Sequence, residues 1–274
     1  GPTLFNVFLN DLFFCMAGEG DSACLYNYAD DNTLSYVSNS MDILMNNIER
    51  LGSMMTAWFS SNGMKANPEK YQMITFGNKR NAPVSLTINN ARVDPQDSVK
   101  LLGICIDEKL DFSQQTSLVC KKASKQVNAM MRLKSVLSEE TRRHVYQAFV
   151  YSCFTYCPAV WLLCNKTNLC QLERIHRRAL RFLYNDYDRS YDDLLQKGGH
   201  RSVKVLLMHS LAIEVFKSLN EIGPSYMSSK FHKQEHQYHV RNEFSLIQRS
   251  FKSIKHGYNS FSYLGAKVWN HLPN

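Results

Sequence analysis

The sequence predicts an α+β fold, in which a front half of mixed helices and strands precedes a rear half that is mostly helical. Short β-prone runs separated by turn residues recur between residues 25 and 106, which is typical of antiparallel strands. From residue 118 to about residue 222, apolar residues follow helical spacing instead. The charge changes at the same place, because residues 1–117 carry 8 Lys+Arg against 13 Asp+Glu, whereas residues 118–274 carry 24 against 11.

Length and composition exclude several classes of protein. The chain has 274 residues, of which 44% are hydrophobic, so it can bury a core. It contains no apolar run long enough to span a membrane, and no basic start followed by an apolar stretch and a cleavage site. We therefore expect no membrane partner and an intracellular location, in the nucleus, the cytoplasm or both. The basic rear half favours nucleic acid as a partner, and a merely soluble surface is the alternative.

The eight cysteines lack the CxxC pairs that most zinc modules show, so we expect buried free thiols. Cys153, Cys157 and Cys164 offer an alternative, because they can share one helix face. Structural zinc sites favour close pairs held by loops, and this spacing therefore argues against a metal centre.

Apolar residues at helical spacing behind Pro2 predict a helix over residues 2–14. Its abrupt beginning leads us to expect that the chain is part of a longer protein. A strand, a carboxylate turn and a second strand are predicted over residues 25–37, with Asp30 and Asp31 at the tip. Paired carboxylates repel each other unless a cation neutralises them, so the turn is a candidate metal site. The alternative is a β-turn without chemistry.

An amphipathic helix is predicted over residues 44–58, with Ser40 as its cap and Gly63 as its stop. Three β-prone stretches follow it, each bounded by Gly, Asn, Pro or Asp. They are residues 72–76, 84–88 and 99–106. The front half is therefore expected to be an antiparallel sheet with packed helices.

The rear half predicts helices over residues 118–132, 139–163 and 170–184, the second of them kinked or divided at Pro158. Residues 224–260 are polar and weakly periodic, so we expect a loop or partial disorder there. The first and third helices each carry a basic side. Its residues are Lys122, Lys125, Arg132, Arg174, Arg177, Arg178 and Arg181. Arginine forks match phosphate oxygens, which makes these helices candidate nucleic-acid surfaces; a solvated basic face is the alternative.

His232, Glu235 and His236 match the H-x-x-E-H spacing of some zinc peptidases. Two histidines one helical turn apart can hold a metal. The flanking residues lack an apolar helical face, and no third ligand with a fixed context can be named. The pattern is therefore weak evidence for a metal site.

Several sequence blocks occur in a definite order. Gly-Pro-Thr-Leu-Phe at residues 1–5 precedes Tyr-Ala-Asp-Asp at residues 28–31, and Asn-Gly-Met-Lys at 62–65 precedes Leu-Gly-Ile at 102–104. This series resembles the reverse transcriptases of non-LTR retrotransposons (LINE-type, jockey or CR1-like). The resemblance covers roughly residues 1–185, including the first helices of the rear half, and extends weakly over the remainder.

The resemblance implies roles for particular residues. Asp30 would be the main metal ligand and Asp31 the supporting one, with Tyr28 and Ala29 completing the motif. Lys70 would assist the departure of pyrophosphate, and its alternative is an exposed lysine after an Asn-Pro turn. The primer grip would consist of Leu102, Gly103 and Ile104.

The resemblance also implies a cofactor and partners. Two Mg²⁺ ions would serve the complete enzyme, whose substrates are an RNA template, a DNA primer and deoxynucleoside triphosphates. In this family an earlier strand supplies a further aspartate, and the fingers hold the nucleotide. Both would precede residue 1, so a missing N-terminal palm and fingers region is an expected partner.

The implied domains are a partial palm with the primer grip in residues 1–117, a helical thumb in 118–165 and a basic helical extension in 166–274. We therefore interpret the chain as a fragment of an RNA-directed DNA polymerase that is inactive alone. The alternative is a non-catalytic remnant that binds nucleic acid through its basic helices. A translated relic without a selected role is a third reading.

Overall fold

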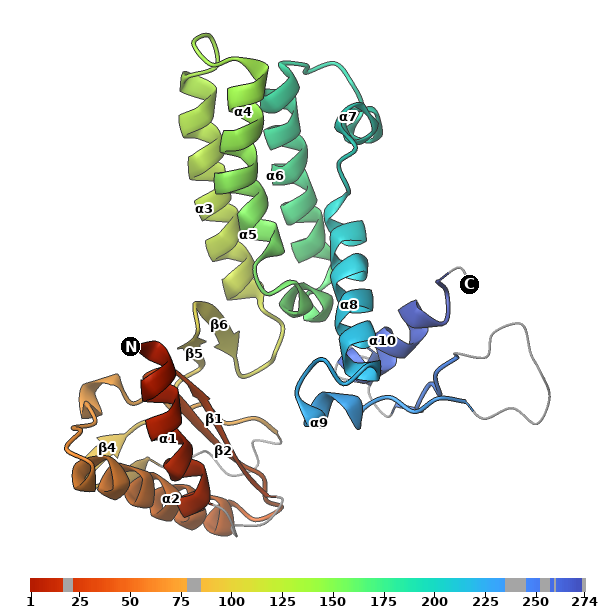
Figure 1. The fold of residues 1–274 in the computed structure, drawn as a ribbon. Helices are drawn as coiled ribbons and strands as arrows, with labels where there is room; N and C mark the ends of the chain where they lie inside the picture. The colour runs from red at the N-terminus through yellow and green to blue at the C-terminus, as the bar shows by residue number, and fades with distance from the viewer. Residues whose placement is uncertain (17–21, 78–84, 235–244, 252–256, 259, 273–274) are drawn as a thin grey trace. The chain divides into compact units, whose positions relative to one another are not determined.

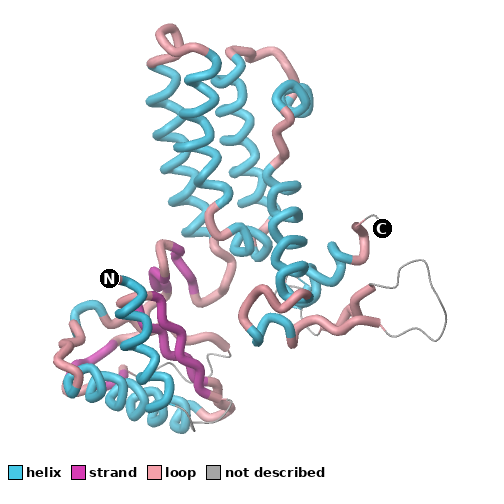
Figure 2. Tube along the Cα trace, viewed as in Figure 1, coloured by secondary structure: helices cyan, strands magenta, loops and turns pink. Residues whose placement is uncertain are grey.

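The protein is represented by a computed structural model that describes residues 1–16, 22–77, 85–234, 245–251, 257–258 and 260–272. The chain divides into two compact units, Gly1–Lys109 and Leu110–Asn274. Among the described residues, all named strands belong to the first unit, and the second consists of helices and loops (Figure 2). The predicted α+β class, with strands in front and helices behind, is confirmed.

The first unit begins with α1 (Pro2–Met16), the hairpin β1 (Ala23–Tyr28) and β2 (Asp31–Tyr36), and α2 (Met41–Ser61) (Figure 1). These elements were all predicted. An apolar cluster joins them, in which Leu9 and Leu12 of α1 and Phe59 of α2 are buried and Leu25 of β1 packs against them. The helices bury the side of β1 that carries Leu25 and leave its other side exposed.

The rest of the first unit consists of short pieces. They are the 3₁₀ turn η1 (Pro68–Lys70) and the strands β3 (Leu86–Ile88), β4 (Ala91–Val93), β5 (Ser98–Leu101) and β6 (Ile104–Asp107). The strands pair as two antiparallel hairpins, β3 with β4 and β5 with β6. The expected sheet is thus present, in the described residues, as three two-stranded pieces.

Two strand predictions in this region were wrong. The stretch at 99–106 is not one strand, because Leu102 and Gly103 both have positive φ and turn the chain back on itself. The stretch at 72–76 makes one bridge only, between Met73 and Pro95. Pro95 has no N–H to donate, so a ladder does not continue there. Sequence patterning also missed β4, which follows a turn of two asparagines, Asn89 and Asn90, with positive φ.

The second unit is built on three long helical segments. They are α3 (Ser113–Arg132), the continuous α4 (Glu139–Val145), η2 (Tyr146–Tyr151, a π-helix) and α5 (Ser152–Thr155), and α6 (Lys166–Tyr184). The 3₁₀ segment η3 (Pro158–Leu163) separates α5 from α6, so the predicted division at Pro158 is confirmed. α3 begins five residues before its predicted start at 118. Asp111 supplies the reason, since its carboxylate accepts a hydrogen bond from the N–H of Ser113 at 2.8 Å.

Four further helices follow: α7 (Tyr191–Gly198), α8 (Val203–Leu219), α9 (Ser225–Ser228) and α10 (Phe261–Trp269). The loop prediction for 224–260 is incomplete, because Phe231 and Leu246 from this stretch are buried in a cluster with Val215 of α8 and Ala266 of α10. The apolar residues of this stretch are scattered among polar ones without a helical or strand period, which is why the sequence did not reveal the cluster.

Candidate active site and nucleic-acid surface

The hairpin of β1 and β2 places the two predicted aspartates at its tip. Tyr28 pairs directly with Asp31, so Ala29 and Asp30 form the two-residue connection. Ala29 has a φ of +50°, the left-handed conformation that tight hairpins require. The side-chain amide of Asn32 donates a hydrogen bond to the backbone oxygen of Asp30 at 3.0 Å and fastens the turn.

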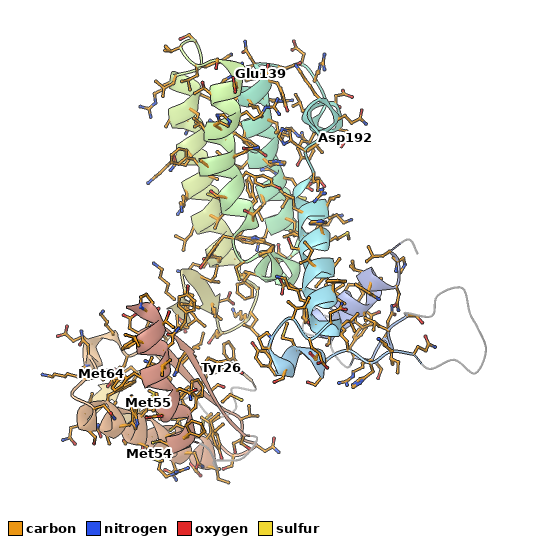
Figure 3. The ribbon with its side chains drawn as sticks, in the orientation of Figure 1. Tyr26, Met54, Met55, Met64, Glu139 and Asp192 are labelled. Carbon is orange, nitrogen blue, oxygen red and sulfur yellow. The ribbon has the colours of Figure 1, made fainter. Side chains whose placement is uncertain are left out.

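The two faces of this hairpin differ. Along β1, Ala23, Leu25 and Asn27 are half-buried, whereas Cys24, Tyr26 and Tyr28 are exposed. Asp31 stands opposite Tyr28 and therefore shares the exposed face, because directly paired residues point to the same side of a sheet. Figure 3 shows Tyr26 on this hairpin. The exposed face thus offers two tyrosines and a carboxylate to a ligand.

Asp30 and Asp31 are both exposed. Their Cα atoms are about 3.8 Å apart because the residues are adjacent, so a cation is needed to hold both charges at one point. Carboxylate oxygens are the ligands that Mg²⁺ prefers, and one or two of them together with substrate phosphates form a typical site. The pair fits such an ion. In the described ranges no group of three His, Cys, Asp or Glu residues could hold a metal.

Sequence patterning missed a pair of asparagines beneath the tip. Asn27 and Asn32 stand directly opposite each other on the inner face. Both polar atoms of the Asn27 amide and the side-chain oxygen of Asn32 are buried without a hydrogen-bond partner. The two-residue period of a strand is the one sequence feature that could have revealed this buried pair, because it places Asn27 on the same face as Leu25.

The other residues assigned by resemblance lie at turns. Lys70 ends η1 and is exposed; the turn is capped by the side chain of Asn67, which accepts a hydrogen bond from the N–H of Glu69 at 3.1 Å. Leu102 and Gly103 form the connection between β5 and β6, and Ile104 is buried at the start of β6. Leu102 has a φ of +46° and is 40% exposed, an unfavourable placement for a large apolar residue in solvent.

The predicted basic residues lie on α3 and α6, which pack against each other. All are exposed except Arg181, which is half-buried, contrary to the expected position at the rim. Arg178 links the two helices through hydrogen bonds to the side-chain oxygen of Asn128 and, at 3.8 Å, to the sulfur of Met131. Arg177 lies over the ring of Tyr191, 5.2 Å from its centroid. Arg178 therefore lies at the seam between α3 and α6, and Arg177 faces α7.

A buried histidine connects several elements of the second unit, and no sequence pattern indicated it. His176 of α6 has no exposed surface. Its Nε2 contacts the Tyr146 hydroxyl at 2.6 Å and its Nδ1 contacts the Tyr191 hydroxyl at 2.6 Å. Burial, with a smaller contribution from His200, lowers the pKa of His176 to about 3, so the ring is neutral and has one donor and one acceptor nitrogen. Burial also raises the pKa of both tyrosines.

The weaker metal hypotheses gain no support. His232 contacts the guanidinium of Arg249, and its proposed partners Glu235 and His236 lie outside the described residues. The eight cysteines are free thiols. Those at 153 and 164 are buried, and the one at 157 is exposed. Within the described segments, no helix has both the length and the apolar character to cross a membrane.

Comparisons with known proteins find similar sequences for the part of the chain that contains the hairpin. Residues 1–106 match the family described as reverse transcriptase (RNA-dependent DNA polymerase). The chain is 28% identical over 190 residues to a probable RNA-directed DNA polymerase from transposon BS, and 23% identical over 187 residues to the RNA-directed DNA polymerase from mobile element jockey, both of Drosophila melanogaster. Each alignment covers 66% of this chain.

These alignments cover 21% and 20% of the two relatives, so the chain spans about a fifth of the length of the curated proteins it matches. A probable RNA-directed DNA polymerase from the X-element transposon of the same fly is 20% identical over 186 residues. No solved structure matches the chain.

Proposed function

We propose that the chain, whose residues 1–106 match the reverse transcriptase family, contributes the catalytic hairpin and a nucleic-acid surface to an RNA-directed DNA polymerase of a non-LTR retrotransposon. The observation that carries the proposal is the hairpin tip. It presents two adjacent carboxylates, Asp30 and Asp31, beside Tyr28, and all three residues are exposed. Nucleotidyl transfer requires such carboxylates at an accessible point.

Both aspartates would act as metal ligands. Asp30, in the turn, and Asp31, at the start of β2, would hold Mg²⁺ against the phosphates of the incoming nucleotide. When bound, two such ions would activate the primer 3′-hydroxyl and neutralise the charge on the triphosphate. Among the described residues no third carboxylate lies beside this pair, and a further ligand would be needed to complete the site.

The other hairpin and the helices would position the substrates. Leu102, exposed at the turn between β5 and β6, would contact the primer strand, and Lys70 would reach the departing pyrophosphate. The seam of α3 and α6 would bind the phosphates of the RNA template and DNA primer. α3 has no acidic residue and α6 has only Glu173, so little on these helices opposes an anionic ligand.

Primer extension on an RNA template tests the catalytic assignment. In a longer protein that contains this chain, Asp30→Asn should lower primer extension more than about 100-fold. Mutation of a residue that only hydrogen-bonds to a metal ligand costs up to about 100-fold, and loss of the ligand itself should cost more. The matched control is Asp42→Asn, an exposed carboxylate in the first turn of α2, which should leave extension unchanged. Full activity of the Asp30 variant would refute the proposal.

This chain alone should not extend a primer, since the pair at the tip does not complete the metal site. It should nevertheless bind an RNA–DNA duplex with an affinity that falls steeply with salt. Neutralising Arg174, Arg177 and Arg178 should reduce the slope of log affinity against log salt by about 3. Asp30-dependent extension by the chain alone would show that the third ligand lies within it.

A further inference from the structure

The turn between β1 and β2 (Figure 1) is strained at Ala29. Ala29 has a φ of +50° and Asp30 has a negative φ, which are the signs of a type II′ turn. Glycine usually occupies the first central position of this turn, because a Cβ atom makes the left-handed conformation unfavourable. An alanine in this conformation persists only where the surrounding contacts hold the backbone in place. The turn therefore depends on whatever contacts it.

One side chain makes such a contact. The side-chain nitrogen of Asn32 donates a hydrogen bond to the backbone oxygen of Asp30 at 3.0 Å. The amide group has one orientation only, because its own oxygen would otherwise face the oxygen of Asp30, and two acceptors repel each other. Among the residues that the structure describes, no other side chain hydrogen-bonds to Ala29 or Asp30. Asn32 is therefore the side chain that secures the turn.

The hydrogen-bonded oxygen lies between the two carboxylates. It belongs to the peptide unit that joins Asp30 to Asp31, and this unit is planar, so fixing its oxygen also fixes the bonds that leave it on both sides. Asp31 is held in addition by its pairing with Tyr28 in the strand ladder. Asp30 lies in the connection and has no ladder partner, so its position relative to Asp31 depends on the turn. The bond from Asn32 thus constrains how the two carboxylates are placed.

Asn32 does not serve stability well at this place. Its side-chain oxygen is buried without a hydrogen-bond partner, on the inner face of the hairpin opposite Asn27. A buried oxygen without a partner is unfavourable, and a β-branched apolar residue suits the inner face of a strand better. Stability alone would favour an apolar residue at position 32, whereas the turn requires the amide.

We propose that Asn32 is a positioning residue, which holds the strained turn in the conformation that lets Asp30 and Asp31 share one metal ion. The inference rests on the proposed function, which makes these two aspartates the metal ligands. Asn32 itself does not touch the ion, because its amide acts through the backbone of Asp30. Without this bond Ala29 can relax to a negative φ, and fewer molecules are able to bind the ion. The apparent affinity for the ion then falls by the same factor.

Binding of terbium(III) to this chain tests the proposal. Like Mg²⁺ and Ca²⁺, Tb³⁺ is a hard cation that takes carboxylate oxygens. A neighbouring tyrosine sensitises its luminescence, so Tyr28, which pairs directly with Asp31, reports an ion at the tip. Asn32→Val removes both the donor and the unsatisfied oxygen of the amide. It should lower the Tb³⁺ affinity about fivefold, as expected for the loss of one hydrogen bond, without lowering the unfolding temperature.

Asn27→Val is the matched control. It removes a buried amide without a partner from the directly opposite position, and that amide makes no bond to the turn. The Tb³⁺ affinity should therefore stay unchanged. Ala29→Gly tests the role of strain, because glycine adopts a positive φ without a steric penalty. When Ala29→Gly is already present, Asn32→Val should change the Tb³⁺ affinity by less than about twofold, which a double-mutant cycle measures.

The outcomes separate this inference from the proposed function. If Asp30→Asn leaves the sensitised luminescence intact, Asp30 is not a metal ligand, and both proposals are wrong. If Asp30→Asn weakens Tb³⁺ binding and Asn32→Val does not, the proposed function stands and the inference is wrong. A lower unfolding temperature of Asn32→Val, or its failure to fold, would show a structural role and would also overturn the inference. So would a fivefold effect of Asn32→Val that remains in the presence of Ala29→Gly.

Discussion

The two units differ in where their most notable polar residues lie. In the first unit, Asp30 and Asp31 are exposed at the tip of a hairpin that a two-residue turn holds in place. In the second, His176 and Arg142 are buried among helices that are distant in sequence. The first arrangement depends on local conformation, and the second depends on packing. Substitutions should therefore affect ligand binding and chemistry in the first unit, and the free energy of unfolding in the second.

The largest expected effect on stability is in the second unit. His176→Ala removes both ring nitrogens, and with them the hydrogen bonds to the buried Tyr146 hydroxyl and to the Tyr191 hydroxyl. The free energy of unfolding should fall by about 4 kcal/mol, measured by urea denaturation, because a cavity forms and two buried hydrogen bonds are lost. Asp31→Ala in the first unit should change it by less than about 0.5 kcal/mol. Similar costs for the two variants would break the comparison.

Lowering the pH should increase the difference in stability between the two units. Because burial holds the pKa of His176 at about 3 in the folded protein, the unfolded chain binds a proton there more readily, with an ordinary pKa of about 6.5. Stability from this group is therefore complete above about pH 6.5 and is lost as the pH falls from there toward 3. The loss should be about 2 kcal/mol at about pH 5. Burial and the nearby Arg143 lower the pKa of His200, which acts in the same direction.

The measurement is urea denaturation across this pH range. His176→Gln cannot titrate, so its stability should depend less steeply on pH than that of the original protein. An unchanged pH dependence in this variant would contradict the assignment of the effect to His176.

Two glycines distinguish packing from local conformation. A Cβ at Gly198 would overlap the Tyr184 hydroxyl, so Gly198→Ala should cost about 2 kcal/mol of unfolding free energy. Tyr184→Phe should reduce that cost in the double variant, as a double-mutant cycle would show. Gly63 has a φ of +72° in open space, so Gly63→Ala should cost about 1 kcal/mol through its backbone alone. If Tyr184→Phe does not reduce the cost of Gly198→Ala, the packing explanation for Gly198 is wrong.

The difference between the units also explains how far the sequence could predict them. The hairpin at residues 25–37 and the helices α1 and α2 follow from period, caps and turn residues, all of which are local. The role of His176 does not, because its partners Tyr146 and Tyr191 come from other elements. In the sequence, a single histidine among the arginines of α6 looks like a surface residue. Only the packing of the helix shows that His176 faces the core.

The smallest expected effect concerns the inner face of the hairpin. Asn27 leaves both polar atoms of its amide buried and unpaired, so Asn27→Leu should raise the free energy of unfolding by about 1 kcal/mol in urea denaturation. Cys24→Leu, on the exposed face of the same strand, is the control and should give no gain. A loss of stability in Asn27→Leu would show that the asparagine pair holds the hairpin together. The first unit would then also depend on buried polar packing, and the contrast with the second unit would fail at the candidate active site itself.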